Sequence, residues 1–225
     1  MKNPITQEMI MNTLDWAYEK ALTSLPGIDS AFEMAEDYKA QEGTLEDKVN
    51  SLIRWQNTKA GTTGFLTGLG GALTLPVTIP ANIATVFYVQ IRMIAAIAVM
   101  GGYDVKNDQV KSLVYAALTG NAANEVLKNT GIQLGTKLTT SLIRSISGET
   151  IKAINRAVGF RLITKFGQTG LVNLGKMLPI LGGVIGGTFD AVSTNIIGNV
   201  ARDAFIKGSP YIIDGELVPQ PAPQE

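Results

Sequence analysis

Residues 81–100, ANIATVFYVQIRMIAAIAVM, decide the fold. The stretch is 20 residues long, carries Arg92 as its only charge, and is followed by Gly101-Gly102, a pair typical of a helix end. A helix that is apolar on all sides is buried in a protein interior or in a membrane. The length matches the roughly 20 residues needed to cross a bilayer, but a central Arg costs at least about 2.5 kcal/mol on insertion. We therefore expect a buried helix, with entry into a bilayer as the alternative.

Glycine-rich runs precede this helix and recur near the end of the chain. Residues 60–75 lead into the break Pro76-Val-Thr-Ile-Pro80, and residues 177–205 contain similar parts, with Pro179 followed by a glycine-rich run and then a helix. Each glycine inside a helix costs about 1 kcal/mol relative to alanine. The glycines are spaced three and four residues apart and so share a helix face, which we expect to allow the close approach of a second backbone. The alternative is that these runs are loops. The predicted helix-packing glycines are Gly61, Gly64, Gly68, Gly71, Gly182, Gly183, Gly186 and Gly187.

The remaining segments show the 3.6-residue periodicity of amphipathic helices. We expect such helices over residues 6–24, 30–41, 44–56, 107–118, 121–146 and 149–166. An Asp-Gly pair within residues 211–218 is typical of a β-hairpin, and residues 219–225 form a Pro/Gln end that we expect to be disordered. The sequence thus predicts an all-α, compact helical domain over residues 1–207, in which amphipathic helices wrap two Gly-rich hydrophobic helical hairpins. A short β-hairpin-like tail follows over residues 208–225.

Composition argues against most enzyme classes. The 225 residues include no Cys and no His. This excludes disulfides, zinc sites built on those residues, and Ser-His or Cys-His catalysis. The carboxylates cluster on solvated N-terminal helices, without the spacing of a calcium loop and without a pair in an apolar setting. We therefore predict a non-enzymatic protein with no catalytic residue, no metal and no cofactor.

The net charge is zero, but the charges are unevenly distributed. Residues 1–50 hold ten acidic and four basic residues, whereas residues 51–180 hold four acidic and thirteen basic ones. A basic region favours an anionic partner, here lipid or a membrane surface. Nucleic acid is disfavoured as a partner, because Phe160 and Phe166 are the only aromatic residues among the basic residues of 128–176 that could stack on nucleobases. The alternative is that the acidic N-terminal helices neutralise this region. The predicted contacts to an anionic surface are Lys137, Arg144, Lys152, Arg156, Arg161 and Lys165.

Arg92 is the best single candidate for a site. An Arg does not deprotonate in a protein, so its burial demands a partner. Asp190 is the one charge between Lys176 and Arg202, which favours an Arg92–Asp190 bridge between the two apolar regions. The alternative is a cavity lined by Arg92 and Gln90 that receives an anionic headgroup or a carboxylate. Asn82 and Asn195 would extend such a polar lining.

An ordered set of segments carries a family resemblance. The segments are Leu52-Ile-Arg-Trp-Gln56, Gly64-Phe-Leu-Thr-Gly-Leu-Gly-Gly71, Leu75-Pro-Val-Thr-Ile-Pro-Ala81, Gln90-Ile-Arg-Met-Ile-Ala-Ala-Ile-Ala98 and Gly102-Tyr-Asp104. Together with residues 154–162 and 179–205, they make the chain resemble the EcsC protein family of bacteria over residues 15–207. The resemblance implies an α-helical, membrane-associated or membrane-proximal bacterial protein. It supplies no reaction and no catalytic residues.

The expected function is therefore that of a membrane-associated protein that binds lipid or a membrane partner, such as a membrane protein, without catalysis. One alternative is an effector whose hairpins insert into a bilayer and permeabilise it, and a second is a lipid-modifying enzyme. Residues 1–25 carry acids throughout rather than an apolar signal segment. We expect a location in the bacterial cytoplasm, peripheral to the inner membrane, or export without a classical signal peptide.

Overall fold

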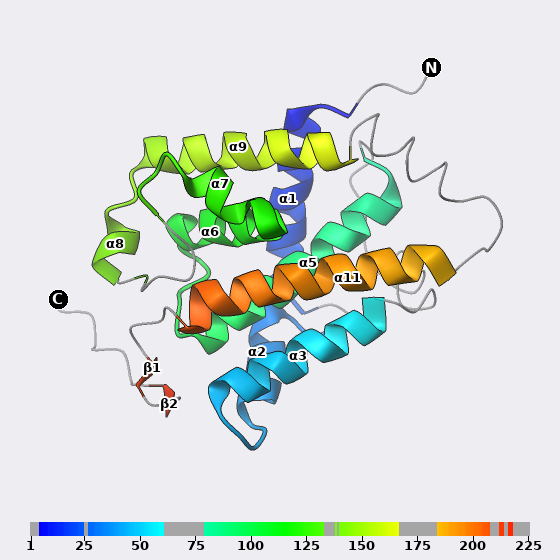
Figure 1. Ribbon diagram of the computed structural model, residues 1–225, viewed down its shortest axis with the longest axis vertical. Helices are drawn as coiled ribbons and strands as arrows, with labels where there is room; N and C mark the ends of the chain where they lie inside the picture. The colour runs from blue at the N-terminus through cyan, green and yellow to red at the C-terminus, as the bar shows by residue number, and fades with distance from the viewer. Residues whose placement is uncertain are drawn as a thin grey trace.

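The computed structural model describes residues 5–24, 27–60, 79–132, 138, 140–166, 184–207, 212–213 and 216–217. The described residues up to 207 form an all-α domain, as the sequence predicts, and Figure 1 shows the arrangement of its helices. The helices are α1 (Gln7–Ala21), α2 (Ala31–Lys39), α3 (Leu45–Ala60), α5 (Ala81–Met100), α6 (Asp108–Leu118), the 3₁₀ turn η1 (Gly120–Ala122), α7 (Ala123–Leu127), α8 (Thr140–Arg144), α9 (Gly148–Phe166), α11 (Val184–Arg202) and the π-helical turn η2 (Asp203–Lys207). Near the C-terminus, β1 (Ile212–Ile213) pairs antiparallel with β2 (Glu216–Leu217).

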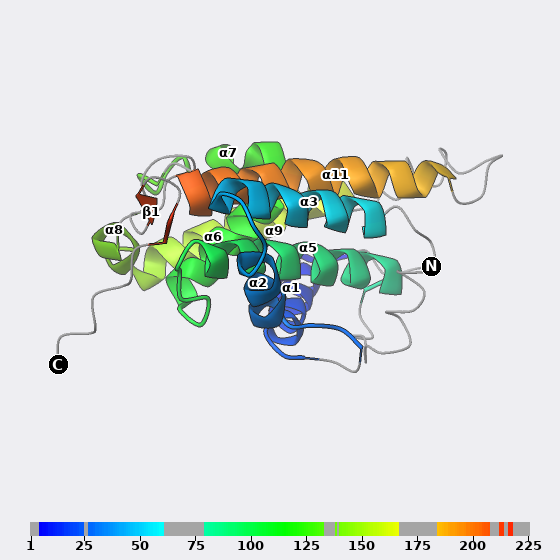
Figure 2. The ribbon, with the colours of Figure 1, turned by 90° about the horizontal axis from the view of Figure 1, so that it is seen from below.

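Helix α5 is the centre of the core, and it has the bounds that the sequence predicts. It packs against α1 and α2 on one side and against α11 and α3 on the other, with α6 alongside. Figure 2 shows these layers, with α3 and α11 side by side above α5 and with α1 and α2 below it. Of the 18-residue window Ile83–Met100, 89% is buried. The amphipathic helices therefore supply the apolar faces that cover α5.

Side-chain caps fix where the surrounding helices begin. Thr6 accepts a hydrogen bond from the backbone N–H of Met9 at the start of α1. Ser30 and Glu33 form a reciprocal capping box at the start of α2, in which each side chain accepts from the other residue's backbone N–H. Such a cap satisfies N–H groups that the first helical turn leaves without partners. The short polar segments between helices thus set the boundaries around the core.

The prediction of one helical region over residues 121–146 is wrong. The chain there forms η1, the short helix α7, a turn and the short helix α8. Gly120 and Gly131 adopt φ values of 63° and 73°, in the left-handed region that ends a right-handed helix. The hydroxyl of Thr130 donates to the carbonyl of Leu127 and accepts from the N–H of Ile132, which stabilises the turn. These breaks bring residues 119–122 against α9 and α11.

Two glycines outside the predicted set lie very close to neighbouring elements. A Cβ on Gly101 would overlap the backbone carbonyl oxygen of Phe205, and a Cβ on Gly198 would lie 2.8 Å from the side chain of Ile53. Gly101 thereby lets η2 approach the C-terminal end of α5. Of the predicted glycines, Gly186 and Gly187 lie on α11, and the other six fall outside the described residues. The two Gly-rich hairpins stay a prediction.

Gly101→Ala is expected to lower the free energy of unfolding by about 3 kcal/mol, because the new methyl group would push apart two backbones that cannot both relax. Gly148→Ala is the matched control, since a Cβ at this first residue of α9 meets nothing within 4 Å. That change should be neutral or slightly stabilising. Urea unfolding measures both, and equal midpoints for the two variants would contradict the close contact at Gly101.

The capping carboxylate of Glu33 should make the stability of the folded protein depend on pH in the acidic range. Hydrogen bonds from Ser24 and Ser30 hold the pKa of Glu33 below its ordinary value of 4.5. A lowered pKa in the folded state means that the stabilisation is complete above the unfolded-state pKa and is lost as the pH falls through the folded-state pKa. Glu33→Gln should therefore flatten the dependence of melting temperature on pH below about pH 4.5.

Glu42→Gln is the control for this measurement, because it makes the same change in charge at an exposed residue outside the caps. It should retain the acid dependence of the wild type. If Glu33→Gln and Glu42→Gln give the same curve, the cap contributes nothing to the pH dependence.

Candidate functional site

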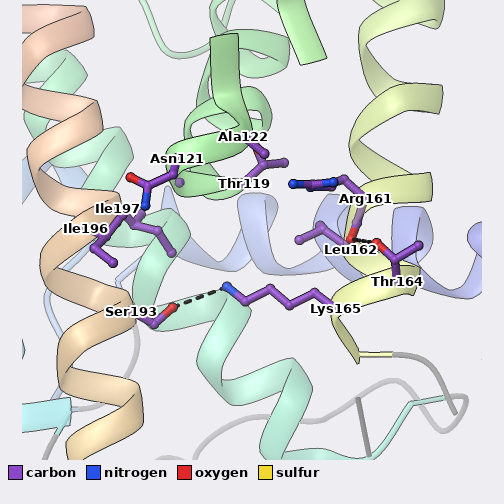
Figure 3. Close-up of a pocket in the computed structure, with 11 residues that line it drawn as sticks. Thr119, Asn121, Ala122, Arg161, Leu162, Thr164, Lys165, Ser193, Ile196 and Ile197 are labelled. Carbon is purple, nitrogen blue, oxygen red and sulfur yellow. Dashed lines mark hydrogen bonds between the residues drawn. The ribbon is translucent and has the colours of Figure 1, made fainter. Parts of the chain in front are cut away.

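A cavity of about 400 Å³ lies between α9, η1 and α11. We call it the α9 pocket, and Figure 3 shows the side chains of Arg161 and Lys165 reaching from α9 toward the other two elements. The breaks around η1 make this pocket possible, because they place a tight turn rather than a continuous helix opposite α9. Its lining residues are Thr119, Gly120, Asn121, Ala122, Arg161, Leu162, Thr164, Lys165, Ser193, Ile196 and Ile197.

The α9 pocket is positively charged. Two cations line it, and none of its described lining residues is acidic. Lys165 Nζ lies 3.3 Å from Ser193 Oγ, so α11 holds the ammonium group at the cavity. Arg161 Nη2 lies 3.6 Å from Glu125 Oε2, but both side chains are at least half exposed, and such a pair contributes at most about 1 kcal/mol. A guanidinium, an ammonium and nearby hydroxyl and amide groups together suit a phosphate or a carboxylate.

The predicted basic residues do not form one surface. Residues 152 and 161 are nine positions apart, which places them on opposite sides of a helix. Lys152 and Arg156 are exposed on the outer side of α9, whereas Arg161 and Lys165 line the pocket. Phe160, with 66% of its surface exposed, is one of two large hydrophobic side chains left exposed in the described part of the chain. Arg144 is exposed on α8, and Lys137 lies outside the described residues.

The acidic N-terminal helices neutralise other cations. Asp15 pairs with Lys111 at 2.6 Å. Glu46 lies 3.8 Å from Arg202 and 3.7 Å from Lys207. Among the described residues, no carboxylate forms an ion pair with Lys152 or Arg156 on the outer side of α9. The N-terminal acids therefore leave the charge of the outer side of α9 available to a partner.

Arg92 defines a second polar site, on the far side of the core. Only 3% of its surface is exposed. Its Nη1 donates to the backbone carbonyl of Asp29 at 3.0 Å, and its guanidinium carbon lies 5.5 Å from the ring centroid of Tyr88. Burial lowers the pKa of Arg92, and Tyr88 and Asp29 oppose that shift. Burial likewise raises the pKa of the Tyr88 hydroxyl, and Arg92 opposes it.

The polar residues predicted around Arg92 are not all brought together. Gln90 is rotated by about 200° from Arg92 around α5, and it donates to Thr194 Oγ1 of α11 at 3.4 Å. Asn195 is exposed and accepts from the amide of Asn57 on α3. The side chains of Asn82 and Asp190 lie outside the described residues, so the Arg92–Asp190 bridge stays a prediction.

Sequence reasoning missed the residues that contact Arg92. Asp29 contributes a backbone carbonyl, and a backbone contact cannot be predicted from the pattern of residue types. Gln56, 1% exposed on α3, lines the same small cavity as Arg92, and nothing in the sequence pattern links the two residues. In the α9 pocket, Thr119, Asn121 and Ser193 also went unnoticed, because they approach α9 only after the chain folds.

Two further observations limit the chemistry and the membrane contacts of the described part of the chain. Its residues contain no group of three or more His, Cys, Asp or Glu side chains that could hold a metal ion. One helix, α5, is long and apolar enough to cross a membrane by length and composition. That helix is covered by protein, as the core helix of a globular domain is.

The comparisons with known proteins identify a family and no individual relative. Comparison with curated proteins found no match, and comparison with solved structures found none either. The model of the EcsC protein family matches residues 6–207, which include every described helix. The resemblance carried by residues 52–104 is therefore confirmed over nearly the whole helical domain, and the chain belongs to the EcsC protein family.

Proposed function

We propose that this protein is a non-enzymatic, membrane-peripheral protein that binds anionic lipid through α9. The observation that carries the proposal is the α9 pocket, where Arg161 and Lys165 face a cavity of about 400 Å³ with no described acidic residue in its lining. A lipid phosphate would accept hydrogen bonds from the guanidinium and the ammonium group. The hydroxyl and amide groups of η1 and α11 lie close enough to contact the same headgroup.

The outer side of α9, opposite the α9 pocket, offers a second and separate contact with an anionic membrane. Lys152 and Arg156 are exposed there and have no ion pair with a described residue. A basic residue near an anionic bilayer surface contributes about 1 kcal/mol. Phe160 projects its ring from the same helix, and aromatic side chains partition into the interface between headgroups and acyl chains. Charge would then hold α9 at the surface, and the ring would anchor it.

Burial of α5 favours this peripheral mode over the permeabilising alternative. For the hydrophobic hairpins to enter a bilayer, α5 would have to leave α1, α2 and α11. A lipid-modifying enzyme is the weaker alternative, because the chain has neither His nor Cys. A membrane protein as partner is a further alternative, and vesicles free of protein distinguish it from lipid binding.

Arg161→Gln combined with Lys165→Gln is expected to weaken binding to vesicles of phosphatidylcholine and phosphatidylglycerol by about thirtyfold. The two lost charges are worth about 1 kcal/mol each. Flotation at low and high salt measures the binding, and added salt should weaken the wild type as well. Circular dichroism checks that the variant keeps its helices.

Arg54→Gln combined with Lys106→Gln is the matched control, because it removes two exposed cations from α3 and the α5–α6 connection. Its binding should equal that of the wild type. Equal wild-type binding to neutral and anionic vesicles, insensitive to salt, would refute the proposal. Release of trapped dye from the same vesicles would favour the permeabilising alternative.

Phe160→Ser tests the anchoring ring separately. Burying part of a Phe side chain contributes up to about 1.5–3 kcal/mol, so the variant should bind anionic vesicles at least about fivefold more weakly. Its melting temperature in solution should not fall, because the ring is mostly exposed in the folded protein. Unchanged vesicle binding would mean that α9 does not bring this ring to the bilayer.

A further inference from the structure

A second cavity, of about 280 Å³, lies against Arg92 and is enclosed by α2, α3, α5 and residues 27–29. We call it the Arg92 pocket. It is separate from the α9 pocket, since the two share no lining residue. The residues that matter for its chemistry are Arg92 and Gln56 at the buried end and Asp29, Asp37, Tyr38 and Trp55 at the exposed end.

Two residues at the buried end of the Arg92 pocket each have a side-chain atom that lacks a hydrogen-bond partner. These atoms are Arg92 Nε, a donor, and Gln56 Oε1, an acceptor, on side chains that are 3% and 1% exposed. Buried polar groups in native proteins are nearly always satisfied, and each exception requires an explanation. In the described part of the chain, no carboxylate lies within 4 Å of the guanidinium. A guanidinium stays charged when buried, so the site calls for an anionic group.

The exposed end of the Arg92 pocket has the opposite character. Asp29 and Asp37 are exposed acids beside the aromatic rings of Tyr38 and Trp55. Burial raises the pKa of the Tyr38 hydroxyl, and the charge of Asp37 adds to that shift. Carboxylates with aromatic faces bind ammonium groups by charge and by cation–π attraction. A plain anion would be repelled by these two acids on its way to Arg92.

We propose that the Arg92 pocket binds a small zwitterion, with its carboxylate or phosphate on Arg92 and its ammonium group between Asp29 and Asp37. Ligand pockets usually begin at about 300 Å³, so the volume admits only a small molecule. Two sources share this chemistry, namely a free amino acid and the phosphoethanolamine headgroup of a lipid.

Isothermal titration of the full-length protein tests the proposal with phosphoethanolamine, with a panel of free amino acids, and with inorganic phosphate and ethylamine as half-ligands. At least one zwitterion should bind saturably, and each half-ligand should bind at least about tenfold more weakly, since it satisfies only one end of the pocket. Amino-acid binding alone would assign a free metabolite. Binding of phosphoethanolamine, together with flotation on neutral vesicles rich in phosphatidylethanolamine, would assign the lipid headgroup.

Asp37→Asn should weaken binding of the zwitterion by about fivefold, because it removes one exposed partner of the ammonium group. Glu36→Gln is the matched control: it makes the same change in charge one position away on α2, outside the pocket lining, and should bind like the wild type. Arg92→Gln should abolish binding. If that variant does not fold, the comparison of Asp37→Asn with Glu36→Gln still tests whether the ligand's ammonium group binds in this pocket.

If inorganic phosphate binds as tightly as phosphoethanolamine, the proposal that the ligand is a zwitterion is wrong. Absence of saturable binding by every probe at millimolar concentrations would overturn the site itself. Neither outcome depends on anionic-lipid binding by α9, because the Arg161 and Lys165 variants measure that at the other pocket.

Discussion

The burial of α5 is the constraint on which the rest of the structure depends. A helix of 20 residues that is apolar all round offers water no polar face, so neighbouring helices must cover its full circumference. The amphipathic stripes of α1, α2, α3, α6 and α11 do this. At its C-terminal end, Gly101 lets the backbone of η2 come into contact, which fixes the last helical segment onto the core. Regions distant in sequence are therefore held through one element.

That same burial makes every polar side chain on α5 conspicuous. Gln90 and Arg92 are two residues apart, so they face different neighbours and have different hydrogen-bond partners. Gln90 finds the hydroxyl of Thr194. Arg92 finds one carbonyl and one aromatic ring, and it keeps Nε without a partner beside a cavity. A guanidinium in that setting costs free energy that a purely structural residue, such as Met or Leu, would avoid. Packing against α11 therefore accounts for Gln90, whereas the proposed ligand would account for Arg92.

The sequence predicts the elements well where local signals and burial agree. Residues 81–100 carry both a continuous apolar run and a glycine stop, and α5 has those bounds. Residues 121–146 also carry a helical apolar pattern, but the left-handed turn at Gly131 interrupts it, and periodicity alone cannot say which glycine ends a helix. The candidate sites show the same limit. Arg92 could be selected from its isolation in the sequence, whereas Asp29 and Gln56 become its neighbours only through folding.

The distribution of charge links the fold to the proposed binding surface. Residues 1–50 have an excess of acidic residues and residues 51–180 an excess of basic ones. The described ion pairs of the N-terminal helices with the rest of the chain join Asp15 to Lys111 and Glu46 to Arg202 and Lys207. Those pairs tie the N-terminal helices to α6 and to the end of α11, where they support packing around α5. Lys152 and Arg156 take part in none of the described ion pairs. An unpaired exposed cation contributes little to folding, so these two residues add little to the stability of the domain, and they are part of the basis for the proposed contact between α9 and an anionic membrane.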